Sequence, residues 1–409
     1  MPTLFRKPSL VFVVATAMTK RRHAMNTTTV CTPLVLVLAL LVLAVSAATS
    51  SVFACVVGTG TSASCTEAAL DACLPGGGSF DGTVTFNCGG TATITVTSTK
   101  TIGADTTIDG GSVITISGGN TVGVFSVNPC VTFTVENLTI ANGNRSSSPA
   151  SGGAIRSLGA SLTVINSTFS GNSAGSDGGA IESDGIDGVG AALTVMNSTF
   201  SSNSTTGFGG AINSNGTLTV MNSTFSSNSC IGDGGAISGS GTVTNSTFSG
   251  NTATGVGGAI FTGALTVSNS TFSGNGAGDG GAIYNNLGTL TVTNGTFSGN
   301  SASSGGGAIW NNFGTVTLTN SILANSTSGG NCGGNPIATD GGHNIDDGTT
   351  CGFTGTGCPT TTGTSFCNMP PLLDPAGLAS NGGPTQTIAL EAGARQSTRA
   401  MRPSARRRP

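Results

Sequence analysis

Residues capable of catalysis or ligand binding are few in this chain, and most of them are acidic. Glu182, Asp184 and Asp187 form the densest group of carboxylates, in a glycine-rich stretch of the chain. Two carboxylates about 5 to 9.5 Å apart can hydrolyse a glycosidic bond by acid–base catalysis. Solvated acids are also common in glycine-rich loops. We therefore predict a chain without catalytic residues and keep these three carboxylates as the alternative.

The sequence predicts no metal and no cofactor. Asp177, Asp233 and Asp279 each precede a Gly-Gly pair in phase, but one carboxylate per repeat supplies too few oxygens for calcium, and Asp before Gly is typical of turns. Zinc-type Cys/His spacing, an HExxH motif and a phosphate loop are missing from the sequence. For His343, the one histidine beyond His23, we predict a structural role.

A repeat positions these residues. Gly-Gly-Ala-Ile occurs seven times, first at Gly152 and last at Gly306, and an Asn-Ser-Thr-Phe-like block follows each copy after 11 to 19 residues. The copies are mostly 23 to 26 residues apart, with one spacing of 31, which is typical of stacked repeats. Apolar residues between the motifs alternate with period two, which predicts short strands. Such strands must stack on the next copy, so we predict an all-β fold, a right-handed single-stranded parallel β-helix.

Equivalent residues of successive repeats should form columns. The isoleucines of the Gly-Gly-Ala-Ile motif should stack inside the coil, and so should the phenylalanines, whose column ends at Leu323. The asparagines three residues after each phenylalanine should form an amide ladder, because identical side chains hydrogen-bond along the axis of a cross-β array. The ladder should contain Asn172, Asn203, Asn228, Asn251, Asn275 and Asn300.

One column changes its chemistry along the chain. The residue after each Gly-Gly-Ala-Ile motif reads, in order, Arg156, Glu182, Asn213, Ser238, Phe261, Tyr284 and Trp310. If the isoleucine points inward, its neighbour points outward. The last three then predict an exposed aromatic strip suited to sugar stacking or to docking of a partner protein. In the alternative, an overlying loop or residues 331–390 cover this strip. Arg156 and Glu182 should pair across adjacent strands.

Two stretches resemble known families. The Gly-Gly-Ala-Ile motif with a Phe-x-x-Asn block, as in Phe248–Asn251, resembles the repeats of the polymorphic outer membrane proteins over about residues 150 to 325. This resemblance implies a secreted or surface-displayed bacterial adhesin. Residues 331–353 and 371–390, above all Asn381–Thr387, resemble the choice-of-anchor Q domain, and beyond Ala394 the sequence leaves that family's pattern.

The first 54 residues predict export. Lys20, Arg21 and Arg22 precede a short apolar run and a V-x-A site that ends at Ala54, the order of a secretory signal peptide. Met25 is an alternative start. Cys55 follows directly and makes lipidation an alternative. We predict a protein secreted or held at the surface or outer membrane of a bacterium, without a transmembrane segment in the mature chain.

The cysteines gather on both sides of the repeats, as expected for disulfides in an exported solenoid. Cys332 and Cys351 flank one glycine-rich loop, and we predict a disulfide between them. A short helix, with Thr66 as its N-cap, should cover one end. The predicted regions are a signal region (1–54), an N-terminal cap (55–83), irregular first coils (84–150), regular repeats (151–330), a cysteine-containing C-terminal cap (331–394) and a disordered basic tail (395–409).

The charge is uneven. Between His23 and Ala394 only Lys100, Arg145 and Arg156 are basic, against all 17 acidic residues, a net charge of about −14. Phosphate contacts need clustered Lys and Arg, so we predict no nucleic-acid partner. We predict a non-enzymatic adhesin or envelope scaffold that binds glycans or surface proteins of host or neighbouring cells. The alternative is a polysaccharide lyase or glycoside hydrolase of the same pectin lyase-like fold.

Overall fold

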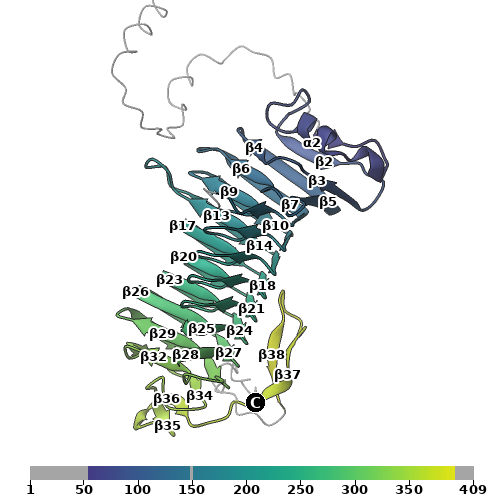
Figure 1. Cartoon of the computed structure of the whole chain (residues 1–409). Helices are drawn as coiled ribbons and strands as arrows, with labels where there is room; N and C mark the ends of the chain where they lie inside the picture. Colours follow the sequence, from purple (N-terminus) through teal and green to yellow (C-terminus); the bar gives the residue numbers. More distant parts are fainter. Residues whose placement is uncertain (1–53, 148–150, 392–409) are drawn as a thin grey trace, which may run out of the picture.

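The computed structural model describes residues 54–147 and 151–391. These residues form a parallel β-solenoid whose coils stack along one axis, with one α-helix at its N-terminal end (Figure 1). The predicted parallel β-helix is confirmed. Of the predicted signal region only Ala54 is described, and the basic tail (395–409) lies outside the described residues.

The N-terminal coils are irregular in length. They contain β1 (Cys55–Val57), the 3₁₀-helix η1 (Ser62–Ser64), α2 (Glu67–Cys73), β2 (Thr83–Phe86), β3 (Ala92–Thr95), β4 (Lys100–Ile102), β5 (Thr106–Ser117), β6 (Phe125–Val127), β7 (Thr132–Ala141) and β8 (Asn144–Arg145). Strand β7 pairs in parallel with β5 on one side and with β10 and β11 of the regular repeats on the other. The irregular coils and the regular repeats therefore form one continuous ladder.

Each regular repeat contributes to three faces. The strands that start at the motif isoleucine, with the strands that continue them, are β9 (Ile155–Leu158), β10 (Ser161–Ile165), β13 (Ile181–Asp184), β14 (Ala192–Met196), β17 (Ile212–Met221), β20 (Ile237–Thr244), β23 (Ile260–Ser268), β26 (Ile283–Thr293), β29 (Ile309–Asn312) and β30 (Thr315–Thr319). The phenylalanine-bearing strands and the end of their column are β11 (Thr168–Ser170), β15 (Thr199–Ser201), β18 (Thr224–Ser226), β21 (Thr247–Ser249), β24 (Thr271–Ser273), β27 (Thr296–Ser298) and β31 (Ile322–Ala324).

The third face is a separate parallel sheet of short strands, ordered along the axis together with β8. It contains β12 (Ser173–Ala174), β16 (Ser204–Thr205), β19 (Ser229–Cys230), β22 (Thr252–Ala253), β25 (Gly276–Asp279) and β28 (Ser301–Gly305). This face lies directly before each Gly-Gly turn. Gly178, for example, has a φ of 62°, a value that only glycine adopts without strain, and a Cβ there would lie 2.1 Å from the Ile181 carbonyl oxygen.

The predicted interior columns are present in register. The motif isoleucines pair from Ile155 to Ile309 along the axis, and each is at most 1 % exposed. The phenylalanine rings from Phe169 to Phe297 stack with centroids 4.7 to 4.9 Å apart. Leu323 pairs with Phe297 at the end of that column. Close packing of identical side chains therefore fills the coil from repeat to repeat.

The asparagine ladder is also present, and it satisfies the buried backbone. Nδ2 of Asn228 donates to Oδ1 of Asn251 and to the carbonyl oxygen of Phe200, each at 3.0 Å. Its own Oδ1 accepts from the backbone N and from Nδ2 of Asn203, at 3.0 and 2.9 Å. The side chain is fully buried. Because every amide both donates and accepts within the column, burial carries no desolvation penalty for a missing partner.

At the N-terminal end, α2 begins after Thr66, whose Oγ1 accepts a hydrogen bond from the backbone N of Ala69 as predicted. The helix presents two carboxylates to Lys100, whose Nζ lies 2.6 Å from Glu67 and 2.8 Å from Asp71. The side chain of Lys100 is only 7 % exposed. These ion pairs and the disulfides Cys55–Cys73 and Cys65–Cys88 attach the helix to the first coils.

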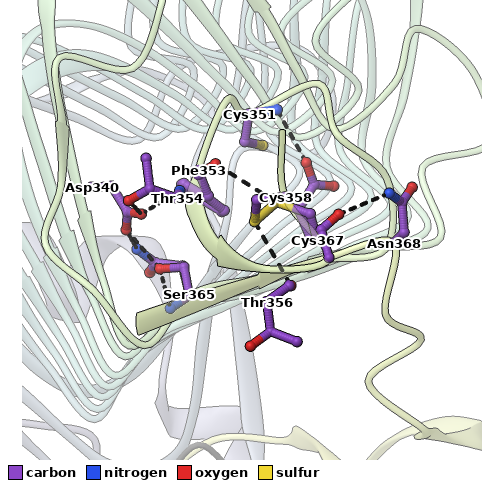
Figure 2. The surroundings of a disulfide bond; sticks show 12 residues. Asp340, Cys351, Phe353, Thr354, Thr356, Cys358, Ser365, Cys367 and Asn368 are labelled. Atoms are coloured by element: carbon purple, nitrogen blue, oxygen red, sulfur yellow. Dashed lines mark hydrogen bonds between the residues drawn. A yellow bond between two sulfur atoms is a disulfide. The ribbon is translucent and has the colours of Figure 1, made fainter. Parts of the chain in front are cut away.

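At the other end, the residues predicted as a C-terminal cap continue the ladder. They form β32 (Cys332–Gly334), β33 (Thr339–Asp340), β34 (Ile345–Asp346), β35 (Thr354–Thr356) and β36 (Thr360–Cys367). Strands β32, β33 and β34 pair in parallel with β29, β30 and β31. Disulfides join Cys332 to Cys351 and Cys358 to Cys367. Figure 2 shows the second bond beside Asp340, which accepts hydrogen bonds from Thr354 and Ser365.

The chain then turns back as an antiparallel hairpin of β37 (Leu373–Ala379) and β38 (Thr387–Leu390) along the flank of the solenoid (Figure 1). Thr385 Oγ1 donates to the Asn245 carbonyl oxygen at 3.1 Å, and Thr247 Oγ1 donates to the carbonyl oxygen of Gln386. Thr247 is 1 % exposed, whereas the equivalent Thr224 is half-buried. The hairpin therefore docks on the phenylalanine-bearing face.

Candidate functional site

The column after the motif isoleucines forms one lateral face of the solenoid, as its position on the strands requires. The register pairs Ser238 with Phe261, Phe261 with Tyr284, and Tyr284 with Trp310. The three aromatic side chains are half-buried, a lower exposure than the sequence predicted. Asn213 and Ser238, earlier in the same column, are 4 % and 8 % exposed. The face is therefore recessed, and at its aromatic end Gly305, directly before the Gly-Gly pair, lies so close to Trp310 that a Cβ there would be 2.6 Å from the ring.

Two of the aromatic rings stack on one another along the solenoid axis. The Phe261 and Tyr284 centroids lie 5.8 Å apart at an interplanar angle of 18°, and Trp310 is the ladder neighbour of Tyr284 on the next coil. On the far side of Trp310, a Cβ on Gly333 would lie 2.7 Å from its ring. Phe261 and Tyr284 thus cover one ring face of each other, and the strip is less open to sugar stacking than the exposed strip that the sequence predicted. Part of the 331–390 segment, at Gly333, backs the end of the strip.

Carboxylates border this strip on the side of the short-strand sheet. Partial burial first, then the charges of Asp279 and Asp233, raise the pKa of the Tyr284 hydroxyl. Burial also raises the pKa of the Asp279 carboxyl. Its Oδ1 is buried and has no hydrogen-bond partner among the described residues. An acceptor of this kind beside aromatic rings favours a ligand that donates hydrogen bonds.

The other two in-phase aspartates have structural partners. Oδ1 of Asp177 accepts from the backbone N of Phe208 at 2.8 Å, and Oδ1 of Asp233 accepts from that of Val256 at 2.9 Å. Each bond joins one coil to the next, which agrees with the predicted turn role. Within the described part of the chain, no group of three or more His, Cys, Asp or Glu residues could hold a metal ion.

The predicted acidic group divides, with Asp184 near Glu182 on β13 and Asp187 in the turn that follows. Glu182 is 5 % exposed, and its Oε2 accepts from Nδ2 of Asn213 at 3.1 Å. Burial, with smaller contributions from Asp177 and Asp184, raises the pKa of Glu182 to about 7. Asp187 lies in the tight turn between Ile186 and Val189, with a φ of 51°. Glu182 and Asp187 therefore lie in different surroundings, one buried and one in a turn.

Arg156 and Glu182 are neighbours across the ladder, as predicted. Among the described residues, however, no salt bridge joins them, and Glu182 is hydrogen-bonded to Asn213 on its other side. Arg156 lowers the pKa of Glu182 only as the smallest of the contributions. The predicted pairing across adjacent strands is therefore wrong in its chemistry, because the amide of the next coil occupies the carboxylate.

Two exposed apolar side chains at the corner next to the strip were not predicted from the sequence. Leu287 and Phe313 are 69 % and 74 % exposed, and both have left-handed backbone conformations with φ of 64° and 53°. Bulky side chains rarely adopt such angles, and strain of this kind is concentrated at functional positions. The available signal is the in-phase pair of segments Asn-Asn-Leu-Gly and Asn-Asn-Phe-Gly after Tyr284 and Trp310.

Comparison with known proteins supports the repeat assignment. Five segments match the family model of the Chlamydia polymorphic membrane protein (Chlamydia_PMP) repeat, namely residues 166–184, 222–240, 245–263, 269–286 and 294–312. The resemblance to polymorphic outer membrane protein repeats is therefore confirmed, and the chain is a β-solenoid that carries repeats of this type. The choice-of-anchor Q resemblance stays a prediction.

Among solved structures, the chain is similar to PfbA, a surface adhesin of Streptococcus pneumoniae, at 13 % sequence identity and a TM-score of 0.40. The match covers 83 % of this chain and 100 % of that one, and a likeness this distant carries no information on function. No curated protein sequence matches the chain. Among the helices of the described residues, none is long and apolar enough to span a membrane.

Proposed function

We propose that this protein is a non-enzymatic adhesin or envelope scaffold, exported to the bacterial surface, whose aromatic strip (Phe261, Tyr284 and Trp310) binds glycans or surface proteins. The observation that carries the proposal is the change of one column from polar to aromatic residues while the interior columns stay constant. Structural need does not explain that change, because Asn213 and Ser238 occupy the same position of the coil without a ring.

Two further observations support a binding role at this face. Leu287 and Phe313 extend the strip outward with large exposed apolar side chains, and exposed apolar clusters mark interaction sites. The polymorphic membrane protein type of the repeats fits a location at the bacterial surface.

The enzymatic alternative has less support. A glycoside hydrolase needs a general acid and a second carboxylate that reach the substrate together. Glu182 has a pKa suited to a general acid, but it is 5 % exposed and hydrogen-bonded to Asn213. Of the other two predicted carboxylates, Asp184 lies on the same strand and contributes to the raised pKa of Glu182, and Asp187 lies in the turn beyond β13. The buried position of Glu182 favours a structural group over a catalytic one.

An adhesion assay tests the proposal. Beads coated with the exported full-length chain should bind to cell surfaces or to immobilised glycans and surface proteins, and Tyr284→Ser with Trp310→Ser should reduce binding at least tenfold. The matched control replaces Thr291 and Thr317, on the same coils but outside the strip, by Ser and should bind as wild type. Unchanged binding by the strip variant would show that another surface is responsible. Release of oligosaccharides from a polysaccharide panel would instead establish the enzymatic alternative.

A further inference from the structure

The corner next to the aromatic strip varies in length from coil to coil. Ile237 and Gly241 pair with Ile212 and Leu218 of the preceding coil, and with Ile260 and Leu265 of the following one. The corner between Ile237 and Gly241 is thus two residues shorter than the corner of the preceding coil and one residue shorter than the corner of the following coil. The missing residues leave a hollow of about 230 Å³, lined by residues 214–216, 238–240 and 261–263.

One side of this hollow is aromatic. Phe261 lines it and is the first ring of the strip, with Tyr284 stacked on the side away from the hollow. The residue that pairs with Phe261 in the preceding coil is Ser238, which is too small to cover a ring. Tyr284 lies between two aromatic residues, and Trp310 lies against Gly333. Phe261 is therefore the ring of the strip with one face that neither another ring nor Gly333 covers.

The other sides of the hollow carry hydroxyl groups. Ser214 and Thr262 each lie two residues after a motif isoleucine and are 1 % exposed, so their side chains are on the interior side of their strands, and Ser240 supplies the accessible hydroxyl. The hydroxyl oxygens of Ser240 and Thr262 accept from the backbone N of Ala264 at 3.1 and 3.2 Å, so the Ser240 hydroxyl keeps its own proton to donate. At Gly239 a Cβ would lie 2.8 Å from the Ser214 carbonyl oxygen, so the glycine lets the two coils approach closely here.

The charge around the hollow limits the ligand. From residue 157 to residue 391 the chain contains 11 acidic residues and neither Lys nor Arg. A sugar acid or a phosphate would find no cation there to balance its charge. A ring face combined with hydroxyl donors and acceptors suits an uncharged ligand that has an apolar face and a hydroxylated edge. The volume is below that of sites for drug-sized ligands, which fits a single ring.

We propose that the hollow between residues 214–216, 238–240 and 261–263 binds one uncharged sugar ring, stacked on Phe261 and hydrogen-bonded by Ser240. This proposal rests on the proposed adhesin function and names the class of ligand and its place on the binding face. The side chains of Tyr284 and Trp310 would then contact the part of the ligand that extends beyond the bound ring.

Saturation-transfer NMR on the full-length chain tests the site. The probes are the methyl glycosides of glucose, galactose, mannose and N-acetylglucosamine, with methyl glucuronide as the charged comparison. At least one neutral glycoside should bind, and the glucuronide should not. Ser238→Phe should fill the hollow by continuing the ring stack and reduce affinity at least tenfold. Phe261→Leu should weaken binding by a similar factor, and Ser298→Ala, on another face, should leave it unchanged.

The results separate the two proposals. Folding of each variant is checked by the fluorescence of Trp310, the only tryptophan in the chain, and Phe261→Leu serves as the deciding variant if Ser238→Phe does not fold. Binding of none of the neutral glycosides, equal binding of the glucuronide, or full affinity in the folded variants would overturn the sugar site. If the sugar site is overturned but the beads still adhere, the proposed adhesin function stands and another surface carries it. If wild-type beads adhere to no surface or glycan, the proposed adhesin function is overturned as well.

Discussion

The middle of the solenoid and its two ends are stabilised by different interactions. In the middle, every coil repeats the same buried contacts, so Asn228 has an asparagine on either side and Phe225 has a stacked ring on either side. At the ends a side chain has no identical neighbour on one side. There the described residues make single-copy interactions, which include the disulfides Cys55–Cys73 and Cys65–Cys88 at one end and Cys332–Cys351 and Cys358–Cys367 at the other, and Lys100 between Glu67 and Asp71. Repetition therefore stabilises the chain only where both neighbours exist.

The C-terminal end shows how one interior column changes where the repeat stops. Leu323 pairs with Asp346 in the next coil, and this aspartate is fully buried. Its carboxylate accepts from the backbone N of Cys351 at 3.0 Å and from that of Gly348 at 2.9 Å. A buried charge is tolerated only when hydrogen bonds satisfy it. The last coil thus replaces an apolar column with a carboxylate that holds the loop of the Cys332–Cys351 disulfide.

The largest effect should come from breaking the ladder in the middle. Asn228→Ala removes four hydrogen bonds of the side chain: the buried backbone N–H of Asn203 loses its partner, and the Asn203 side-chain amide and the Phe200 carbonyl each lose one. The free energy of unfolding should fall by about 4 kcal/mol or more, measured by urea denaturation. Ser226→Ala, a half-buried position nearby, is the control and should change it by less than about 0.5 kcal/mol. A small effect at Asn228 would mean that water replaces the amide.

Removing one end disulfide should have a smaller and local effect. Cys332→Ser with Cys351→Ser opens a loop with a sequence separation of 19 residues, which should cost about 3 kcal/mol. Hydrogen exchange should accelerate in β29 and β32 and stay unchanged in β15 and β18. Equal acceleration in both regions would show that the ends and the middle unfold together, against the proposed difference between them.

Glu182 is a buried ionisable side chain in the middle of the solenoid, where the repeated buried residues are uncharged. Because burial raises its pKa to about 7 from the ordinary 4.5, the folded chain holds a proton that the unfolded chain releases between these values. The free energy of unfolding should therefore fall as pH rises from about 4.5 to 7, by on the order of 3 kcal/mol. Glu182→Gln should remove that fall, so that the variant is the more stable protein at pH 8.

Urea denaturation at pH 4.5 and pH 8 measures this difference. Glu136→Gln, a half-buried position on β7, is the matched control and should keep the pH dependence of the wild type. The same dependence in Glu182→Gln would assign it to other groups.

The smallest expected effect is at the exposed corner. Leu287→Gly relieves a left-handed conformation that costs a leucine about 1 kcal/mol, but it adds chain entropy to the unfolded state. Thermal or urea denaturation should therefore show a change in the free energy of unfolding of less than about 1 kcal/mol in either direction. Bead adhesion should fall in the same variant if the exposed side chain contributes to binding. A strongly destabilised variant would show that Leu287 is held for packing rather than for contact with a partner.

The fold and its interior columns could be predicted from the sequence because each repeat carries the same residues at the same spacing. Stacking in register is then the one arrangement that buries every motif isoleucine and phenylalanine. The asparagine ladder is predictable for the same reason. The short helix and its Thr66 cap were also predictable, since N-capping is a local property of the chain.

How the outer columns meet their surroundings depends on the tertiary structure. The alternation of strand residues correctly placed Glu182 and Tyr284 opposite the interior. It did not show that this face is recessed, that Gly305 lies against Trp310, or that Phe261 and Tyr284 stack along the axis. The hollow beside Phe261 depends on the difference in corner length among three coils, which matters only once the coils are stacked. The repeated interior is thus encoded in the sequence alone, because identical neighbours impose identical contacts, whereas the proposed binding face arises from packing between segments that differ.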